Sequence, residues 1–145
     1  MPNSKPRRSP LDTLLSLLTL EALDRDLYLA QTPRGEGRLF GGLVAAQSAL
    51  AASATVPHER ALHSLHAYFL RPGQHGAPIR FTVDRIRDGR SFTTRRVVAH
   101  QGGEAIFNLD ASFCVAETGV AHQDARPEAP PPEGLPDWED LRAAM

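Results

Sequence analysis

The spacing of hydrophobic positions predicts two helices of different kinds in the first third of the chain. One apolar stripe recurs at i, i+3, i+4 and i+7, at Leu11, Leu14, Leu15 and Leu18. Ser9 suits the N-cap of this helix and Pro10 its first turn, so we expect it to begin there. The stripe should pack across an open sheet face or a neighbouring subunit. A short strand is expected at 27–29.

The second predicted helix, residues 41–56, is small or apolar on nearly every side. Such a helix is buried on most of its faces, and in a short chain the simplest cover is a sheet wrapped around it. It opens with Gly41 and Gly42, which carry no Cβ, so a ligand can approach the backbone closely. The unpaired N–H groups of a first helical turn suit a carbonyl oxygen that gains negative charge.

Alternating apolar and polar positions then predict four long strands, at 62–70, 78–87, 91–100 and 104–115. Both faces of the first strand are apolar, so we expect it in the interior of the sheet. Asp88-Gly89 and Gly102-Gly103 predict tight turns, and a shift of phase at Ile86 predicts a β-bulge. The expected fold is α+β, a curved antiparallel β-sheet wrapped around a central α-helix, which is the hotdog fold.

Composition supports one folded domain with additional segments at its ends. Of 145 residues, 41% are hydrophobic and 23% are charged, which allows a packed core and argues against global disorder. We expect residues 1–8 to be a disordered arm and residues 9–119 to be the hotdog domain. Residues 120–145 are rich in proline and are expected to be a stiff inter-domain linker.

Charge and cysteine content indicate which partners, metal sites and cellular compartment to expect. A net charge of −1 argues against nucleic acid or an anionic membrane as partner. Cys114 is the single cysteine, so no internal disulfide can form, and no His/Cys pair has the spacing of a structural zinc site. No stretch has the pattern of a secretory signal or a membrane span. We therefore expect a cytoplasmic protein without a metal or other cofactor.

Several short segments carry a family resemblance through their order and spacing. They are Leu-Leu-Ser-Leu-Leu at 14–18, Arg-Leu-Phe-Gly-Gly at 38–42, the run from Leu62 to Gly73, Arg-Asp-Gly-Arg-Ser-Phe at 87–92, Ile-Phe at 106–107 and Ala-Ser-Phe at 111–113. Together they resemble the type II acyl-CoA thioesterases, the TesB-like family. The resemblance implies hydrolysis of fatty acyl-CoA to free fatty acid and CoA, by a chain of two hotdog domains joined by a proline-rich linker.

The resemblance covers about residues 11–136, the first hotdog domain and the start of the linker. The family's Asp, Thr and Gln that polarise the hydrolytic water belong to the second hotdog domain, to which no part of this sequence corresponds. The family also usually has Gln after the Gly-Gly pair, where Leu43 stands here. We expect this chain to form a homodimer or to pair with a second hotdog domain.

The candidate substrate-binding residues are Gly41, Gly42, Leu43, Tyr68, Arg90 and Arg95. Arginine suits bidentate phosphate binding, and CoA carries several phosphates. A solvated charged face is the alternative explanation for the arginines, and tight packing of the helix against the sheet is the alternative for the glycines.

His66 is the candidate catalytic residue, and it shares a strand face with Tyr68. His63 lies an odd number of positions away, so we expect the two imidazoles on opposite faces of the strand. A structural hydrogen bond is the alternative explanation for each histidine.

These observations leave three functions in competition. The first is an acyl-CoA thioesterase domain that needs a second hotdog domain for full activity. The second is a non-catalytic acyl-CoA-binding or assembly half. The third, a hotdog dehydratase or hydratase, ranks below both because residues 38–56 contain neither the Asp nor the His which those enzymes place near the central helix.

Overall fold

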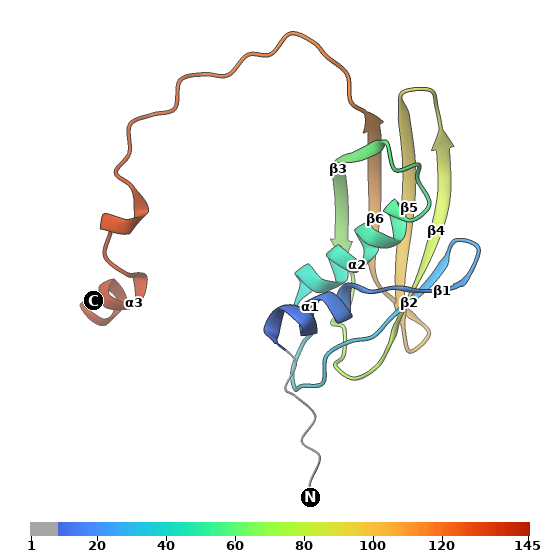
Figure 1. Ribbon diagram of the computed structural model, residues 1–145. Helices are drawn as coiled ribbons and strands as arrows, with labels where there is room; N and C mark the ends of the chain where they lie inside the picture. Colours follow the sequence, from blue (N-terminus) through green and yellow to red (C-terminus); the bar gives the residue numbers. More distant parts are fainter. Residues whose placement is uncertain (1–8) are drawn as a thin grey trace, which may run out of the picture.

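The computed structural model describes residues 9–145, so the arm expected at residues 1–8 lies outside the described residues (Figure 1). In chain order the elements are α1 (Pro10–Leu18), β1 (Glu21–Asp24), β2 (Leu27–Ala30), α2 (Gly41–Ser53), β3 (Arg60–Phe69), β4 (Ile79–Asp88), β5 (Phe92–Gln101), β6 (Glu104–Val115), a 3-10 helix η1 (Pro132–Gly134) and α3 (Trp138–Ala143).

The six strands form one antiparallel sheet in the order β1-β2-β4-β5-β6-β3. Helix α2 crosses one face of this sheet and packs against β5 and β6 (Figure 1). The largest buried apolar side chains are Phe81, Phe107, Phe113, Ile79 and Leu109. Burial of each contributes roughly 1.5–3 kcal/mol. The predicted α+β hotdog fold is confirmed.

Two local details of the strand prediction are also confirmed. The pairing of β4 with β5 shifts between Arg85 and Arg87, so that Ile86 is the extra residue of a bulge. Gly102 and Gly103 turn the chain from β5 into β6 with φ of 61° and 89°. These left-handed values carry no steric penalty for glycine, which explains why the pair stands there.

The predicted start of α1 is confirmed. The Asp12 N–H donates to Ser9 Oγ at 3.0 Å, and the Ser9 N–H donates to the Asp12 carboxylate at 3.3 Å, which together form a capping box. The helix meets α2 through Leu17, whose carbonyl accepts from Gln47 Nε2 at 2.7 Å. The apolar stripe stays largely exposed, so what covers it remains a prediction.

The expectation of an interior position for residues 62–70 is wrong. Strand β3 pairs with β6 alone and forms one edge of the sheet. Its apolar side chains Leu62, Leu65 and Phe69 are 37%, 49% and 65% exposed. Strand β3 therefore carries apolar side chains that residues 9–145 leave exposed.

The C-terminal segment departs from β6 and runs away from the sheet (Figure 1). Residues 116–131 contain neither helix nor strand, and the short helices η1 and α3 follow. The sequence analysis did not anticipate α3, where Asp137 Oδ1 accepts from the Glu139 N–H at 2.8 Å as an N-cap. The linker role of residues 120–145 stays a prediction. Among residues 9–145, every helix is too short or too polar to cross a membrane.

Candidate functional site

A pocket of about 340 Å³ opens where α2 begins. Its walls come from the start of α2 with the residues before it, the end of β3 with the following turn, and β6. Most of the lining is apolar, with side chains from Leu39, Val44, Phe69, Leu70, Ile106 and Phe107. This volume lies at the lower end of the range for small-molecule sites.

Two loops that lie far apart in the sequence form the mouth of the pocket. The Leu39 N–H donates to the Gly73 carbonyl at 3.1 Å, and Arg38 forms an isolated bridge with Gln74. A Cβ on Gly73 would lie 2.9 Å from Leu39 Cδ1, so glycine is needed for this close approach. The two loops are therefore held at a fixed separation.

A bulge in β6 supplies the pocket floor. The register between β5 and β6 skips Ile106, so Ile106 and Phe107 are both buried although they are neighbours in the chain. The Ile106 carbonyl accepts from the N–H groups of Leu70 and Arg71, at 2.9 and 3.1 Å. These two hydrogen bonds fix the end of β3 and the following turn next to Ile106, at the pocket floor.

Gly41 and Gly42 lie at the start of α2 as predicted, and each faces an aromatic ring. A Cβ on Gly41 would lie 2.7 Å from Phe69 Cε1, and a Cβ on Gly42 would overlap the ring of Phe40. Both rings belong to exposed side chains, so close packing explains the two glycines only while these rings keep their positions. Gly41 also lines the pocket, so for this residue the packing and ligand explanations coincide.

The other residues predicted near Gly41 are not brought together with it. Leu43 is buried but does not line the pocket. The neighbours of His66 and Tyr68 along β3 are Leu65 and Ala67, which pair with residues buried under α2. Because side chains alternate along a strand, His66 and Tyr68 point to the opposite face of the sheet. There their rings contact each other, with centroids 4.8 Å apart.

The expectation that His63 and His66 lie on opposite faces is wrong. The pairing of β3 with β6 shifts between Leu62 and Ser64, and the extra residue resets the alternation. His63 Nε2 therefore lies 2.8 Å from Ser112 Oγ, on the same outer face as His66. This hydrogen bond matches the structural explanation for His63.

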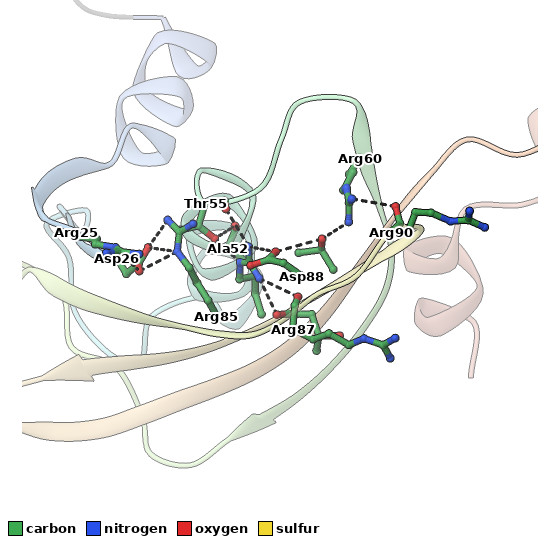
Figure 2. Close-up of polar contacts among 12 residues, drawn as sticks. Arg25, Asp26, Ala52, Thr55, Arg60, Arg85, Arg87, Asp88 and Arg90 are labelled. Atoms are coloured by element: carbon green, nitrogen blue, oxygen red, sulfur yellow. Dashed lines mark hydrogen bonds and ion pairs between the residues drawn. The ribbon is translucent and has the colours of Figure 1, made fainter.

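Arg95 is buried inside the domain rather than presented to a phosphate. Its guanidinium is 1% exposed, and all three of its nitrogens donate. Nε donates to Thr55 Oγ1 at 2.8 Å, and Nη2 donates to the Thr55 carbonyl at 3.1 Å and to Asp88 Oδ1 at 2.6 Å. Figure 2 shows Thr55, Asp88 and Arg87 around this network. Arg95 thus ties the end of α2 to the β4–β5 hairpin.

Arg90 lies at the exposed tip of that hairpin, where its carbonyl accepts from Arg60 (Figure 2). The hairpin meets α2 at its C-terminal end, through Arg95 and Thr55. The pocket lies at the N-terminal end, and the 13 residues of α2 separate the ends by about 18–20 Å. Arg90 and Gly41 therefore cannot contact the same small group.

Two carboxyl groups around the buried arginine network are held in the charged form. The hydrogen bond from Arg95 lowers the pKa of Asp88. A bidentate hydrogen bond from Arg85, at 2.8–3.0 Å, lowers the pKa of Asp26 in the β1–β2 turn (Figure 2). The Asp88–Arg95 pair lies within the β4–β5 hairpin and fixes the guanidinium that also holds Thr55 after α2, whereas the Asp26–Arg85 pair joins the β1–β2 turn to β4.

Sequence reasoning assigned no role to Arg38, Phe69 and Arg71, which line the pocket. All three stand inside the segments that carry the family resemblance, and that was the signal available. The pocket lining contains no His, Asp, Glu, Ser or Thr. Across the described part of the chain, no three His, Cys, Asp or Glu side chains gather as metal ligands do.

Comparison with known proteins gives a consistent family. Residues 30–114 match the acyl-CoA thioesterase N-terminal domain family. The chain is 44% identical over 130 residues to acyl-coenzyme A thioesterase 8 of Mus musculus, covering 87% of this chain and 40% of that protein. It is 40% identical over 128 residues to acyl-CoA thioesterase 2 of Haemophilus influenzae, covering 88% and 45%.

A similar solved structure indicates the same family as the two sequence relatives. The acyl-CoA thioesterase II TesB2 from Mycobacterium marinum superposes with a TM-score of 0.75 at 47% identity, covering 88% of this chain and 47% of that one. The chain thus spans less than half the length of these relatives. It belongs to the type II, TesB-like acyl-CoA thioesterase family, as that family's N-terminal hotdog domain.

Proposed function

We propose that this chain supplies the acyl-binding half of an acyl-CoA thioester hydrolase. The acyl part of a fatty acyl-CoA enters the apolar pocket, and hydrolysis to fatty acid and CoA takes place when a second hotdog domain is present. The observation that carries this proposal is the pocket of about 340 Å³ that reaches Gly41 at the first turn of α2.

The first turn of α2 can stabilise the charge that develops on the thioester carbonyl. Phe40 is the N-cap and provides no side-chain hydrogen bond, so the first N–H groups of the helix are not capped by a side chain. A donor aimed at a developing oxyanion is typically worth about 10²–10³ in rate. Gly41, which lines the pocket, would bring a carbonyl close to these donors once the exposed Phe69 ring moves aside.

The same pocket lacks a group that could activate water. A positioned general base typically contributes about 10²–10⁴ in rate, and no lining side chain can act as one. His66 points to the other face of the sheet, so it is not the base for this pocket. A base supplied from elsewhere in an assembly would complete the site, which is why we propose a second hotdog domain.

The exposed side of β3 is the surface we propose for that pairing. It combines an unpaired strand edge with exposed Leu62, Leu65 and Phe69. Unpaired edges and contiguous apolar patches favour association. In such an assembly Leu43 would support the acyl-binding helix from the core, and the exposed Arg90 remains a candidate for a CoA phosphate. The cytoplasmic location stays a prediction.

A non-catalytic acyl-CoA-binding or assembly half is the second candidate function. The absence of any acid–base side chain from the pocket lining favours it. In this case the chain would bind acyl-CoA and pair with a partner, but the assembly would not hydrolyse the thioester.

Release of free thiol from a panel of acyl-CoAs separates the two functions. The chain is assayed alone and with an added second hotdog domain from one of the related thioesterases. We expect little or no turnover by the chain alone and clear turnover by the pair. Binding without turnover in both arms would favour the non-catalytic function, and full turnover by the chain alone would contradict the need for a second domain.

A further inference from the structure

The pocket at the start of α2 joins an apolar wall to two cationic side chains. Of residues 9–145, Arg38 and Arg71 are the only ionisable ones that line it, and none of the carboxylates in this range lines it to neutralise them. An apolar cavity whose lining includes two guanidinium groups suits a ligand that has an apolar body and an anionic end.

The guanidinium of Arg38 is free of partners among the described residues. Arg38 is exposed, and its side chain makes no hydrogen bond or ion pair with any residue in the range 9–145. Its backbone is nevertheless fixed, because Arg38 bridges Gln74 and the next residue, Leu39, is bonded to Gly73. The side chain therefore projects from a rigid base without an internal partner.

Arg71 is anchored on one side and open on the other. Its Nη1 donates to the Ala105 carbonyl at 2.8 Å, and its Nε lies 3.7 Å from Glu104 Oε2. Glu104 is 69% exposed, and an ion pair this long and exposed contributes little. Nη2 makes no bond with a described residue. Because Nη1 is already held, ordering this side chain around a ligand costs less entropy.

We propose that Arg38 and Arg71 bind the carboxylate of a free fatty acid whose tail lies against Ile106 and Phe107. The proposal rests on the assignment of this pocket to the acyl group in the proposed function. Hydrolysis turns a neutral thioester into a carboxylate, and guanidinium groups hydrogen-bond a carboxylate in a bidentate way. The pair thus makes the pocket a product site that favours the acid over a neutral acyl group.

Titration calorimetry of the 145-residue chain with octanoate tests the pair, with octanol as the uncharged control ligand. We expect octanoate to bind more tightly than octanol, because a hydrogen bond to a charged group is the stronger kind. Arg38→Gln and Arg71→Gln should each weaken octanoate about tenfold or more and leave octanol unchanged. Arg34→Gln, at an exposed arginine outside the pocket lining, is the matched control and should change neither.

Arg38→Gln keeps the experiment decisive, since the Arg38 side chain makes no hydrogen bond or ion pair with residues 9–145 whose loss could unfold the chain. Equal affinity for octanoate and octanol, or octanoate binding unchanged in the Arg38→Gln, Arg71→Gln double variant, would overturn the proposal. So would competition by CoA without an acyl group that disappears in the double variant, because the arginines would then serve a phosphate. Octanoate binding needs no second domain, so this outcome is independent of whether the thioester is hydrolysed.

Discussion

Arg95 Nη2 donates to Asp88 Oδ1 at 2.6 Å, from a guanidinium that is 1% exposed to a carboxylate that is 56% exposed. The bond crosses from the buried face of β5 to the end of β4, and the same guanidinium holds Thr55 after α2. Arg95, a charged residue that the sequence pattern places on a strand, is therefore part of the core.

Replacing Asp88 with Ala should destabilise the domain by about 1–2 kcal/mol. The buried guanidinium of Arg95 then loses its counter-charge, although solvent exposure of Asp88 reduces the loss. Urea unfolding followed by circular dichroism measures the change. Asp84→Ala removes an exposed carboxylate from the same strand that makes no hydrogen bond with a described residue, so it should stay close to the parent chain.

Acid should weaken the anchoring of the β1–β2 turn to β4. The hydrogen bond from Arg85 lowers the pKa of Asp26 in the folded state, so the carboxylate stabilises the fold at pH values above its usual pKa of 3.8. This contribution, about 1 kcal/mol or less for a partly exposed pair, is lost as the pH falls through the lowered pKa.

The Asp26→Asn variant isolates this acid effect. Asn tolerates the φ of 60° at this position, so the backbone is preserved while the titrating group is removed. Stability of the variant should fall less steeply than that of the parent between about pH 5 and pH 2. Parallel pH curves for the two chains, measured by urea unfolding, would contradict the prediction.

A methyl group on Gly41 should affect the pocket more than the fold. Alanine favours the helix by up to about 1 kcal/mol, and this gain offsets the displacement of the exposed Phe69 ring. We expect a stability change within about 1 kcal/mol but an octanoate affinity lowered about tenfold, the size of effect one methylene has in a tight pocket.

Gly42→Ala is the matched control for that experiment. It places the same methyl group in the same helical turn, against the exposed Phe40 ring and outside the pocket lining. We expect the two variants to have the same stability in thermal unfolding and to differ only in the octanoate affinity that titration measures. Equal losses of affinity would show that helix geometry, and not pocket volume, is responsible.

Association should depend on the exposed face of β3. The chain is expected to form a homodimer at micromolar concentration, and Leu65→Asp should shift it toward monomer, because Leu65 lies between Leu62 and Phe69 on that face. Light scattering across a dilution series measures the mass. Ile86→Asp makes the same change at an exposed apolar residue on β4 and should leave the mass unchanged. A parent chain that is monomeric throughout would contradict the pairing.

Local chemistry explains why much of the fold could be predicted from the sequence. Ser9-Pro10, the phase shift at Ile86 and the pair Gly102-Gly103 each act within a few residues, so their cap, bulge and turn follow from neighbours in the chain. From Phe107 to Phe113 the core side of β6 alternates regularly, and the bounds of the strand, 104–115, were predicted without error, although the bulge at Ile106 was not predicted. Helix α2 is small or apolar on nearly every side, which likewise predicted a sheet against it.

Only the tertiary structure decided which residues meet. The extra residue at His63 moved its imidazole to the outer face, and burial turned Arg95 from a candidate ligand contact into a structural bridge. Arg38 and Arg71 line the same pocket because the hydrogen bond from Leu39 to Gly73 joins two loops more than thirty residues apart. The alternation of apolar and polar positions and the helix or strand propensity indicate whether a residue is buried. Which residue it contacts is set by strand register, by bulges and by chain reversals between segments that are distant in sequence.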